Sequence, residues 1–151
     1  MIVVNPQRSV IFIGVIAFCI ILGLSNFNMS KFERRMRDLK VLSGALENYR
    51  ARNGQYPPQG NEHLAIGVSK LTGLTGIDVL VPHYISAIPR DLQRLYELNR
   101  QYLYFSDGKD YKLIAYGLED VGWVIAKRPE HLDPRRPTYA YGIWTAGAVD
   151  W

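Results

Sequence analysis

An uncharged apolar run near the N-terminus is the first pattern along the chain. Residues 9–25 read SVIFIGVIAFCIILGLS. These 17 residues reach the lower limit of the roughly 17 to 25 that a helix needs to cross the hydrocarbon core of a bilayer. We therefore expect residues 1–28 to form a single-pass transmembrane anchor with its span at about residues 9–25. The lipid-facing side chains would be Val10, Ile11, Phe12, Ile13, Ile16, Phe18, Ile20, Ile21, Leu22 and Leu24.

A cleaved signal peptide is the competing interpretation of this run, with Gly23-Leu24-Ser25 as a small-residue cleavage site. The run is longer than most signal-peptide cores. It also leads into a second helical pattern with no proline or glycine break directly after Gly23. Both features favour an uncleaved anchor.

The second pattern covers residues 29–53, where apolar residues recur in steps of three and four. This spacing predicts an amphipathic helix with one apolar face. We expect that face to pack on the protein's own sheet through Phe32, Met36, Leu39, Leu42, Leu46 and Tyr49. Asn53-Gly54 would end the helix, with Gly54 in the left-handed conformation. A capping box of Ser30 and Glu33 would separate the two helices, whereas without such a break they would form one rod of about 40 residues, roughly 60 Å long.

Residues 54–100 read as a loop region, in which residues 74–81 and 92–98 are the best candidates for ordered pieces. Strand formers begin at residue 101, and Asp107-Gly108 signals a tight turn before a second strand at residues 111–117. A further pair of strands is expected at residues 123–126 and 139–145. The predicted fold class is α+β, with a long N-terminal helix packed on a small antiparallel sheet at residues 101–151, so that residues 29–151 form one domain.

The net charge of +4 is concentrated next to the apolar run. Residues 31–52 carry seven basic and three acidic side chains, whereas the rest of the chain beyond residue 52 carries ten and eleven. The nearly neutral remainder gives no electrostatic reason to expect nucleic-acid binding. While the apolar stripe faces the core, Arg34, Arg35 and Arg37 could meet anionic lipid head groups. Taken alone, this charge asymmetry opposes export of the C-terminal domain.

The sequence offers no candidate catalytic or metal site, and we expect no cofactor. His63, His83 and His131 are far apart and lack ligand spacing. Glu119 and Asp120 are adjacent acids, but neighbours on an extended chain point to opposite sides. Cys19 is the only cysteine, so an intramolecular disulfide is excluded.

Aromatic residues are concentrated at the end of the sequence beside Arg135 and Arg136. Aromatic and arginine side chains are enriched at interaction sites. The candidates for a partner surface are Tyr139, Tyr141, Trp144 and Trp151. The alternative is that this segment is the last strand and closes the core.

Two motifs carry a resemblance to a known family. The helix ends as Leu39...Leu42...Ala45-Leu46...Tyr49...Asn53-Gly54-Gln55-Tyr56-Pro57, and the hairpin reads Tyr102...Tyr104...Ser106-Asp107-Gly108...Tyr111...Leu113. Together with the apolar N-terminal helix and Pro89-Arg90-Asp91 before the hairpin, this order resembles the type IV pilin-like proteins, with the closest likeness to the major pseudopilin of type II secretion. The likeness covers roughly residues 10 to 120.

The resemblance implies a non-enzymatic structural subunit of a secretion or pilus-type system. Its apolar helix would first anchor it in the inner membrane and then pack in a filament core. The C-terminal domain would lie in the periplasm or outside the cell, despite the charge asymmetry. The implied partners are membrane lipid, other pilin-like subunits or envelope secretion components, and further copies of the chain.

The chain departs from the family at its start. Gly14 is followed by Val15-Ile16-Ala17 rather than by the Phe-Thr-Leu-Ile-Glu-like sequence that prepilin peptidase processes, and no acidic residue lies between Met1 and Phe32. Either translation begins further upstream, or the protein keeps its anchor and does not polymerise by the usual route. The second case would make it an unprocessed, membrane-anchored envelope scaffold. A third hypothesis, an envelope enzyme acting on glycans, would need two convergent carboxylates.

Overall fold

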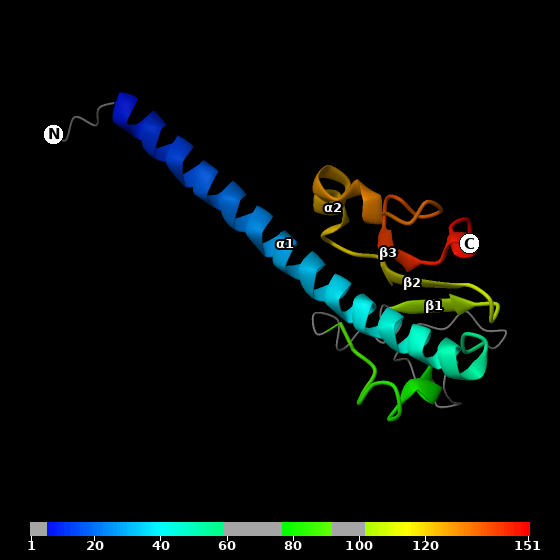
Figure 1. Ribbon diagram of the computed structural model, residues 1–151. Coiled ribbons are helices and arrows are strands. Elements are labelled where there is room, and N and C mark those ends of the chain that lie inside the picture. Colours follow the sequence, from blue (N-terminus) through cyan, green and yellow to red (C-terminus); the bar gives the residue numbers. More distant parts are fainter. Residues whose placement is uncertain (1–5, 59–76, 92–101) are drawn as a thin grey trace.

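The computed structural model describes the backbone of residues 6–58, 77–91 and 102–151, and the side chains of these ranges from Ile20 onward except Ser25. One long helix, α1 (Pro6–Asn53), extends well beyond a small domain formed by the rest of the described chain (Figure 1). Its 48 residues correspond to roughly 72 Å.

The helix α1 runs through Ser30 without a break. The Ser30 hydroxyl donates to the backbone oxygen of Phe27 at 2.8 Å, so it bonds within the helix instead of capping a new one. At the other end Gly54 has a φ of 78°, and its N–H donates to the Arg50 oxygen at 2.8 Å. The prediction that Gly54 ends the helix in the left-handed conformation is confirmed.

A three-stranded antiparallel sheet lies against the C-terminal half of α1. Its order is β1 (Leu103–Ser106), β2 (Tyr111–Tyr116), β3 (Ala140–Trp144), with Leu113 of the central strand paired to Tyr104 and Ile143. The predicted hairpin turns at Gly108, which has a φ of 89°. The coarse fold prediction, a long helix and a small antiparallel sheet of the α+β class, is confirmed.

The strand predicted at residues 123–126 is wrong, because this segment lies in the helix α2 (Val121–Lys127). The Asp120 oxygen accepts the N–H groups of Trp123 and Val124, which starts the helix. Only Val124 is fully buried in it, and Ile125 is exposed. The apolar residues of this segment suit a strand as well as a helix, but the outer edge of β3 pairs with Leu132 and not with this segment.

Short 3₁₀ turns make up η1 (Asp78–Leu80), η4 (Pro129–His131) and η5 (Ala146–Ala148). Part of the ordered piece expected at residues 74–81 is therefore η1. The piece expected at residues 92–98 lies outside the described residues.

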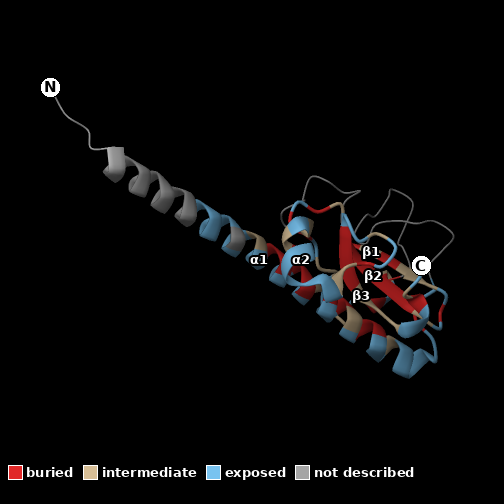
Figure 2. Ribbon diagram, turned by 90° about the horizontal axis from the view of Figure 1, so that it is seen from above, coloured by how far each residue is buried: buried red, intermediate tan, exposed pale blue. Residues whose placement is uncertain are grey.

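The core lies between α1 and the sheet (Figure 2). The stripe residues Phe32, Met36, Leu39, Leu42 and Leu46 are buried, and Tyr49 packs half-buried against them. The sheet contributes residues that alternate toward α1, including Tyr104, Leu113 and Tyr141. The helix therefore has two parts, one packed on the sheet and one that projects from it.

Candidate functional site

The projecting part of α1 exposes large apolar side chains. Where its side chains are described, Ile20, Ile21, Leu22 and Leu24 are 47% to 63% exposed, and Phe27 and Met29 are exposed as well. A protein rarely leaves a contiguous apolar surface bare unless another protein or a membrane covers it. The side chains of the other expected anchor residues (Val10, Ile11, Phe12, Ile13, Ile16 and Phe18) are not described. Within the described part of the chain, no helix has both the length and the hydropathy of a membrane span.

A buried ion cluster lies where the projecting part of α1 meets the domain. Nε of Arg35 donates to Asp91 Oδ2 at 2.7 Å, and its Nη1 donates to Asp120 Oδ1 at 2.8 Å. Its Nη2 also donates to Glu119 Oε1 at 3.3 Å, and Lys31 Nζ donates to that same oxygen at 2.9 Å. We call these five residues the Arg35 cluster. It joins α1 to two loops that are far away in the sequence.

The charges at the centre of this cluster are almost completely buried, so each of them needs its partner. Arg35 is 1% exposed, Asp91 3% and Asp120 0%. A buried charge is costly unless it is paired, and here the guanidinium meets three carboxylates. The Tyr141 hydroxyl satisfies the second oxygen of Asp120 at 3.0 Å. The expectation that Arg35 meets lipid head groups is therefore wrong, while Arg34 and Arg37 are exposed.

The electrostatics of the cluster follow from its burial. Burial alone would lower the pKa of Arg35, but Tyr141, Asp120 and Asp91 outweigh it and raise that pKa above its ordinary value. Burial raises the pKa of Asp120, and Arg35 and the Tyr141 hydroxyl oppose that rise. The cluster thus has a guanidinium that stays charged and a carboxyl whose ionisation depends on it.

Aromatic packing adds to the cluster at the same end of the domain. The Phe32 ring lies 5.3 Å from Tyr141, 5.5 Å from His131 and 5.6 Å from Trp123, measured between ring centroids. These partners come from β3, η4 and α2. The ion pairs and the rings together fix the direction in which α1 leaves the domain.

A second buried cation lies on the other face of the sheet. Lys112 in β2 is 0% exposed, and its Nζ donates to Asp133 Oδ1 at 3.0 Å and to the backbone oxygens of Val149 and Trp151 at 2.9 and 3.0 Å. Arg136 Nη1 reaches Asp133 Oδ2 at 2.8 Å and the Trp151 oxygen at 2.9 Å. These bonds hold the last residues of the sequence against the sheet.

The four aromatic residues proposed as a partner surface do not form one surface. Tyr141 is 0% exposed and faces α1, so the core interpretation holds for it. Tyr139 is 41% exposed and packs edge-on against Tyr116, with ring centroids 5.4 Å apart. Trp144 and Trp151 are half-buried, and the Trp144 ring lies over the Lys112 ammonium.

The acidic pair at residues 119 and 120 converges, contrary to expectation. It lies in a turn rather than on an extended chain, so Glu119 and Asp120 both reach Arg35. The cation they bind is a side chain of this protein. Within the described residues no three His, Cys, Asp or Glu side chains group in a way that could hold a metal ion. His83 is exposed in a turn and His131 packs on Phe32, while His63 lies outside the described part.

The sequence contained one signal for the burial of Arg35. Arg35 follows Phe32 by three residues and precedes Leu39 by four, which places it inside the apolar stripe. Arg34 and Arg37 fall outside that stripe. Nothing comparable marks Asp91 or Asp133 as buried partners.

No family model, curated protein or solved structure matches the chain.

Proposed function

We propose that this chain is a non-enzymatic, pilin-like or pseudopilin-like structural subunit of a type II secretion or type IV pilus-type system. It acts by protein–protein assembly, is held in the inner membrane by residues 9–25, and carries its domain in the periplasm or outside the cell. The observation that carries the proposal is the group of exposed apolar side chains described between Ile20 and Met29 of α1, a helix that continues without a break into the half that packs on the sheet.

The Arg35 cluster supports this role mechanically. An anchored subunit must transmit its position in the membrane, or in a filament core, to its outer domain. A hinge between the anchor and the outer domain would let the domain move independently of the anchor. Instead, α1 is continuous, and charged and aromatic contacts fix the domain to it at the first buried turn.

An unprocessed envelope scaffold with the same fold is the alternative, in which the anchor stays in the membrane and the chain does not polymerise. The absence of acidic residues between Met1 and Phe32 favours it, because the family's helix carries a glutamate that pairs with a neighbouring subunit.

Membrane fractionation of the full chain tests the anchor. Ile21→Arg should release protein from carbonate-washed membranes, because an arginine inside a span costs up to roughly 2.5 to 3.5 kcal/mol at the centre of the bilayer. Val41→Arg is the matched control, since Val41 is also an exposed apolar residue of α1 but lies in the half that packs on the sheet. Equal retention of the two variants contradicts the proposal.

Intact mass and N-terminal sequencing of the membrane-bound protein then separate the two functions. A mature chain that begins within or just before residues 9–25 supports a processed, polymerising subunit. A chain that starts at Met1 supports the scaffold. A start near Asn26 means that the apolar run was a signal peptide, and it overturns both.

A further inference from the structure

The helix α2 lies at the end of the domain from which α1 projects (Figure 1, Figure 2). Phe32 packs on Trp123 of α2, and Glu33 Oε1 lies 4.0 Å from Nη2 of Arg128, the residue that follows α2. Glu33 comes eight residues after the end of the expected span at residues 9–25, which is roughly 12 Å along the helix. The head-group layer outside the hydrocarbon core is about 5 to 7 Å thick. A helix that crosses the bilayer at residues 9–25 would therefore hold α2 close to the outer edge of the head groups.

The segment around η1 marks the opposite end of the domain. Tyr84, shortly after η1, packs on Tyr49 with ring centroids 5.4 Å apart. Tyr49 follows Phe32 by 17 residues, roughly 26 Å along α1. Val79 in η1 is 50% exposed, so an apolar side chain is accessible at each end of the domain.

The α2 end combines exposed apolar and basic side chains. Ile125 is 46% exposed, and Lys127 at the end of α2 and Arg34 on the neighbouring α1 are exposed too. An apolar side chain beside Lys and Arg is the combination by which helices lie in the interfacial layer of a membrane. Long basic side chains can also keep their charged ends at the head groups while their stems cover apolar surface.

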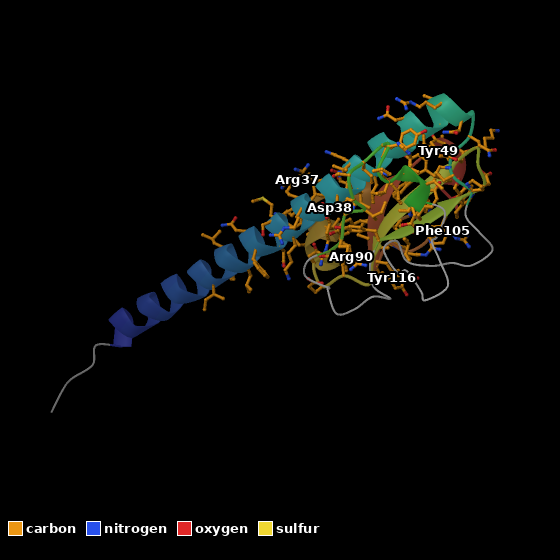
Figure 3. All side chains as sticks on the ribbon, turned by 90° about the horizontal axis from the view of Figure 1, so that it is seen from below. Arg37, Asp38, Tyr49, Arg90, Phe105 and Tyr116 are labelled. Carbon is orange, nitrogen blue, oxygen red and sulfur yellow. The ribbon has the colours of Figure 1, made fainter. Side chains whose placement is uncertain are left out.

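Some basic side chains at this end reach no carboxylate within ion-pair distance. Arg34 and Arg37 act on the half-buried Asp38 only from further away, where they oppose the rise that burial causes in its pKa. Figure 3 shows Arg37, one turn beyond Arg34, on the side of α1 away from the sheet. The exposed carboxylates nearby are engaged: Glu33 and Glu130 lie 4.0 and 3.7 Å from Arg128, and Glu119 binds Lys31 and Arg35 in the Arg35 cluster. Among the described residues, three exposed cations at this end take part in neither a hydrogen bond nor an ion pair, namely Arg34, Arg37 and Lys127.

We propose that the α2 end of the domain rests on the membrane surface, with Ile125 in the interfacial layer and Arg34 and Lys127 on anionic lipid head groups. The inference rests on the proposed function, because the span at residues 9–25 sets the height of α2 above the bilayer. Lipid is the partner that fits, since it supplies negative charge and an apolar layer on one surface. The contact holds the domain against the membrane at the point where the Arg35 cluster already fixes it to α1.

Fluorescence quenching in vesicles tests the contact in the full chain, with Cys19→Ser as the background. A fluorophore is attached to Ile125→Cys, and the vesicles combine phosphatidylcholine, phosphatidylglycerol and a lipid with a nitroxide on its head group. The probe at residue 125 should be quenched several-fold more strongly than the same probe at Val79→Cys, the equally exposed position at the far end. Equal quenching at the two positions overturns the inference.

Charge reversal tests whether anionic lipid is the partner. Arg34→Glu with Lys127→Glu should reduce quenching of the residue 125 probe several-fold, and so should vesicles of phosphatidylcholine alone or high salt, which screens surface charges. Arg52→Glu with Lys109→Glu is the matched control, because both residues are exposed and the charge changes equally. All four substituted side chains are exposed, and circular dichroism checks that the variants stay folded. Quenching that survives the first double variant contradicts the role of these cations.

Two further measurements distinguish the ways in which the inference can fail. A chain that floats with carbonate-washed vesicles but shows no excess quenching at residue 125 overturns the lipid contact and leaves the anchor proposal standing. A chain that does not float overturns both. Shielding of the residue 125 probe that appears only when each vesicle holds many copies assigns the α2 end to a second copy and overturns the lipid contact.

Discussion

Nε of Arg35 lies 2.7 Å from Oδ2 of Asp91, and both side chains are almost completely buried. The two residues are 56 positions apart in the sequence. Arg35 also binds Asp120, so one helical side chain ties two distant loops to α1. The contacts that hold the domain at a fixed angle to the projecting helix lie close to this guanidinium.

Arg35→Met should therefore destabilise the domain strongly. The substitution keeps most of the side-chain volume but leaves Asp91 and Asp120 buried without their cation, which costs about 3 to 5 kcal/mol. Denaturant unfolding of the full chain in mild detergent measures the loss. Arg34→Met is the matched control, because Arg34 is exposed, and it should change stability by at most about 0.5 kcal/mol. Equal stability of the two variants would contradict the role of the cluster.

The same variant should respond to pH in a defined direction. Burial raises the pKa of Asp120, and Arg35 opposes the rise. Without Arg35 that pKa should rise further. An acid whose folded pKa lies above its unfolded value favours the folded state as the pH falls. The deficit of Arg35→Met relative to the parent chain should shrink from neutral to mildly acidic buffer; a constant deficit would mean that no buried carboxyl takes up a proton.

Patterns that depend on local geometry predicted much of this fold. The three-and-four spacing from Phe32 to Tyr49 marked the buried helix face, and Gly54 and Gly108 marked two of the three described positions with positive φ. These patterns are reliable because they depend on local backbone conformation and on burial of one helix face, and not on which distant segments come into contact. The prediction of a strand at residues 123–126 was wrong because its apolar residues suit either a strand or a helix. The outcome depended on Leu132, which pairs with the edge of β3.

The charged contacts were harder to predict. Lys112 alternates away from α1, so a two-layer architecture predicts that it is exposed. It is buried because the last residues of the sequence fold back over the outer face of the sheet and accept its hydrogen bonds. A contact between residues so far apart in the sequence produces no hydrophobic periodicity from which it could be predicted.

Lys112→Met should release that terminal segment. The change leaves Asp133 buried without Lys112, and removes the donor to the oxygens of Val149 and Trp151. We expect a loss of at most about 3 to 5 kcal/mol, because Arg136 still contacts Asp133. Limited proteolysis should cut the terminal residues faster than in the parent chain. Lys109→Met, at an exposed turn position, should leave both readouts unchanged.

Alanine substitution of two glycines, one in β3 and one in α1, tests how closely the backbone packs at each position. A Cβ at Gly142 would overlap the Leu113 oxygen and lie 2.9 Å from Ile114 Cα, so Gly142→Ala must push β3 away from β2. We expect a loss of about 1 to 3 kcal/mol or more. Gly44→Ala is the contrasting variant, because no atom outside its own stretch of helix backbone lies within 4 Å of the added Cβ and the helix interior favours alanine by roughly 0.5 to 1 kcal/mol. Thermal unfolding should move in opposite directions for the two, and a shift in the same direction would contradict this packing.

Buried tyrosines should make the domain sensitive to alkali. Burial raises the pKa of Tyr111 from 10.0 to about 12, with Ser43 opposing and Glu47 adding to the rise. Burial likewise raises the pKa of Tyr102, Tyr104 and Tyr141. A group whose folded pKa is raised gives stability that is complete below its unfolded pKa and is lost as the pH rises through the folded value.

Denaturant midpoints should accordingly stay constant up to a pH of about 10 and then fall steeply toward about 12. Phenolate absorbance, followed in parallel, should show a first phase from exposed tyrosines and then a cooperative second phase that coincides with loss of the circular dichroism signal. Gradual ionisation of every tyrosine with the domain still folded would contradict the burial of these four rings. Tyr111→Phe should shift the second phase to higher pH, because one fewer proton is released on unfolding, whereas substitution of the exposed Tyr139 should leave it in place.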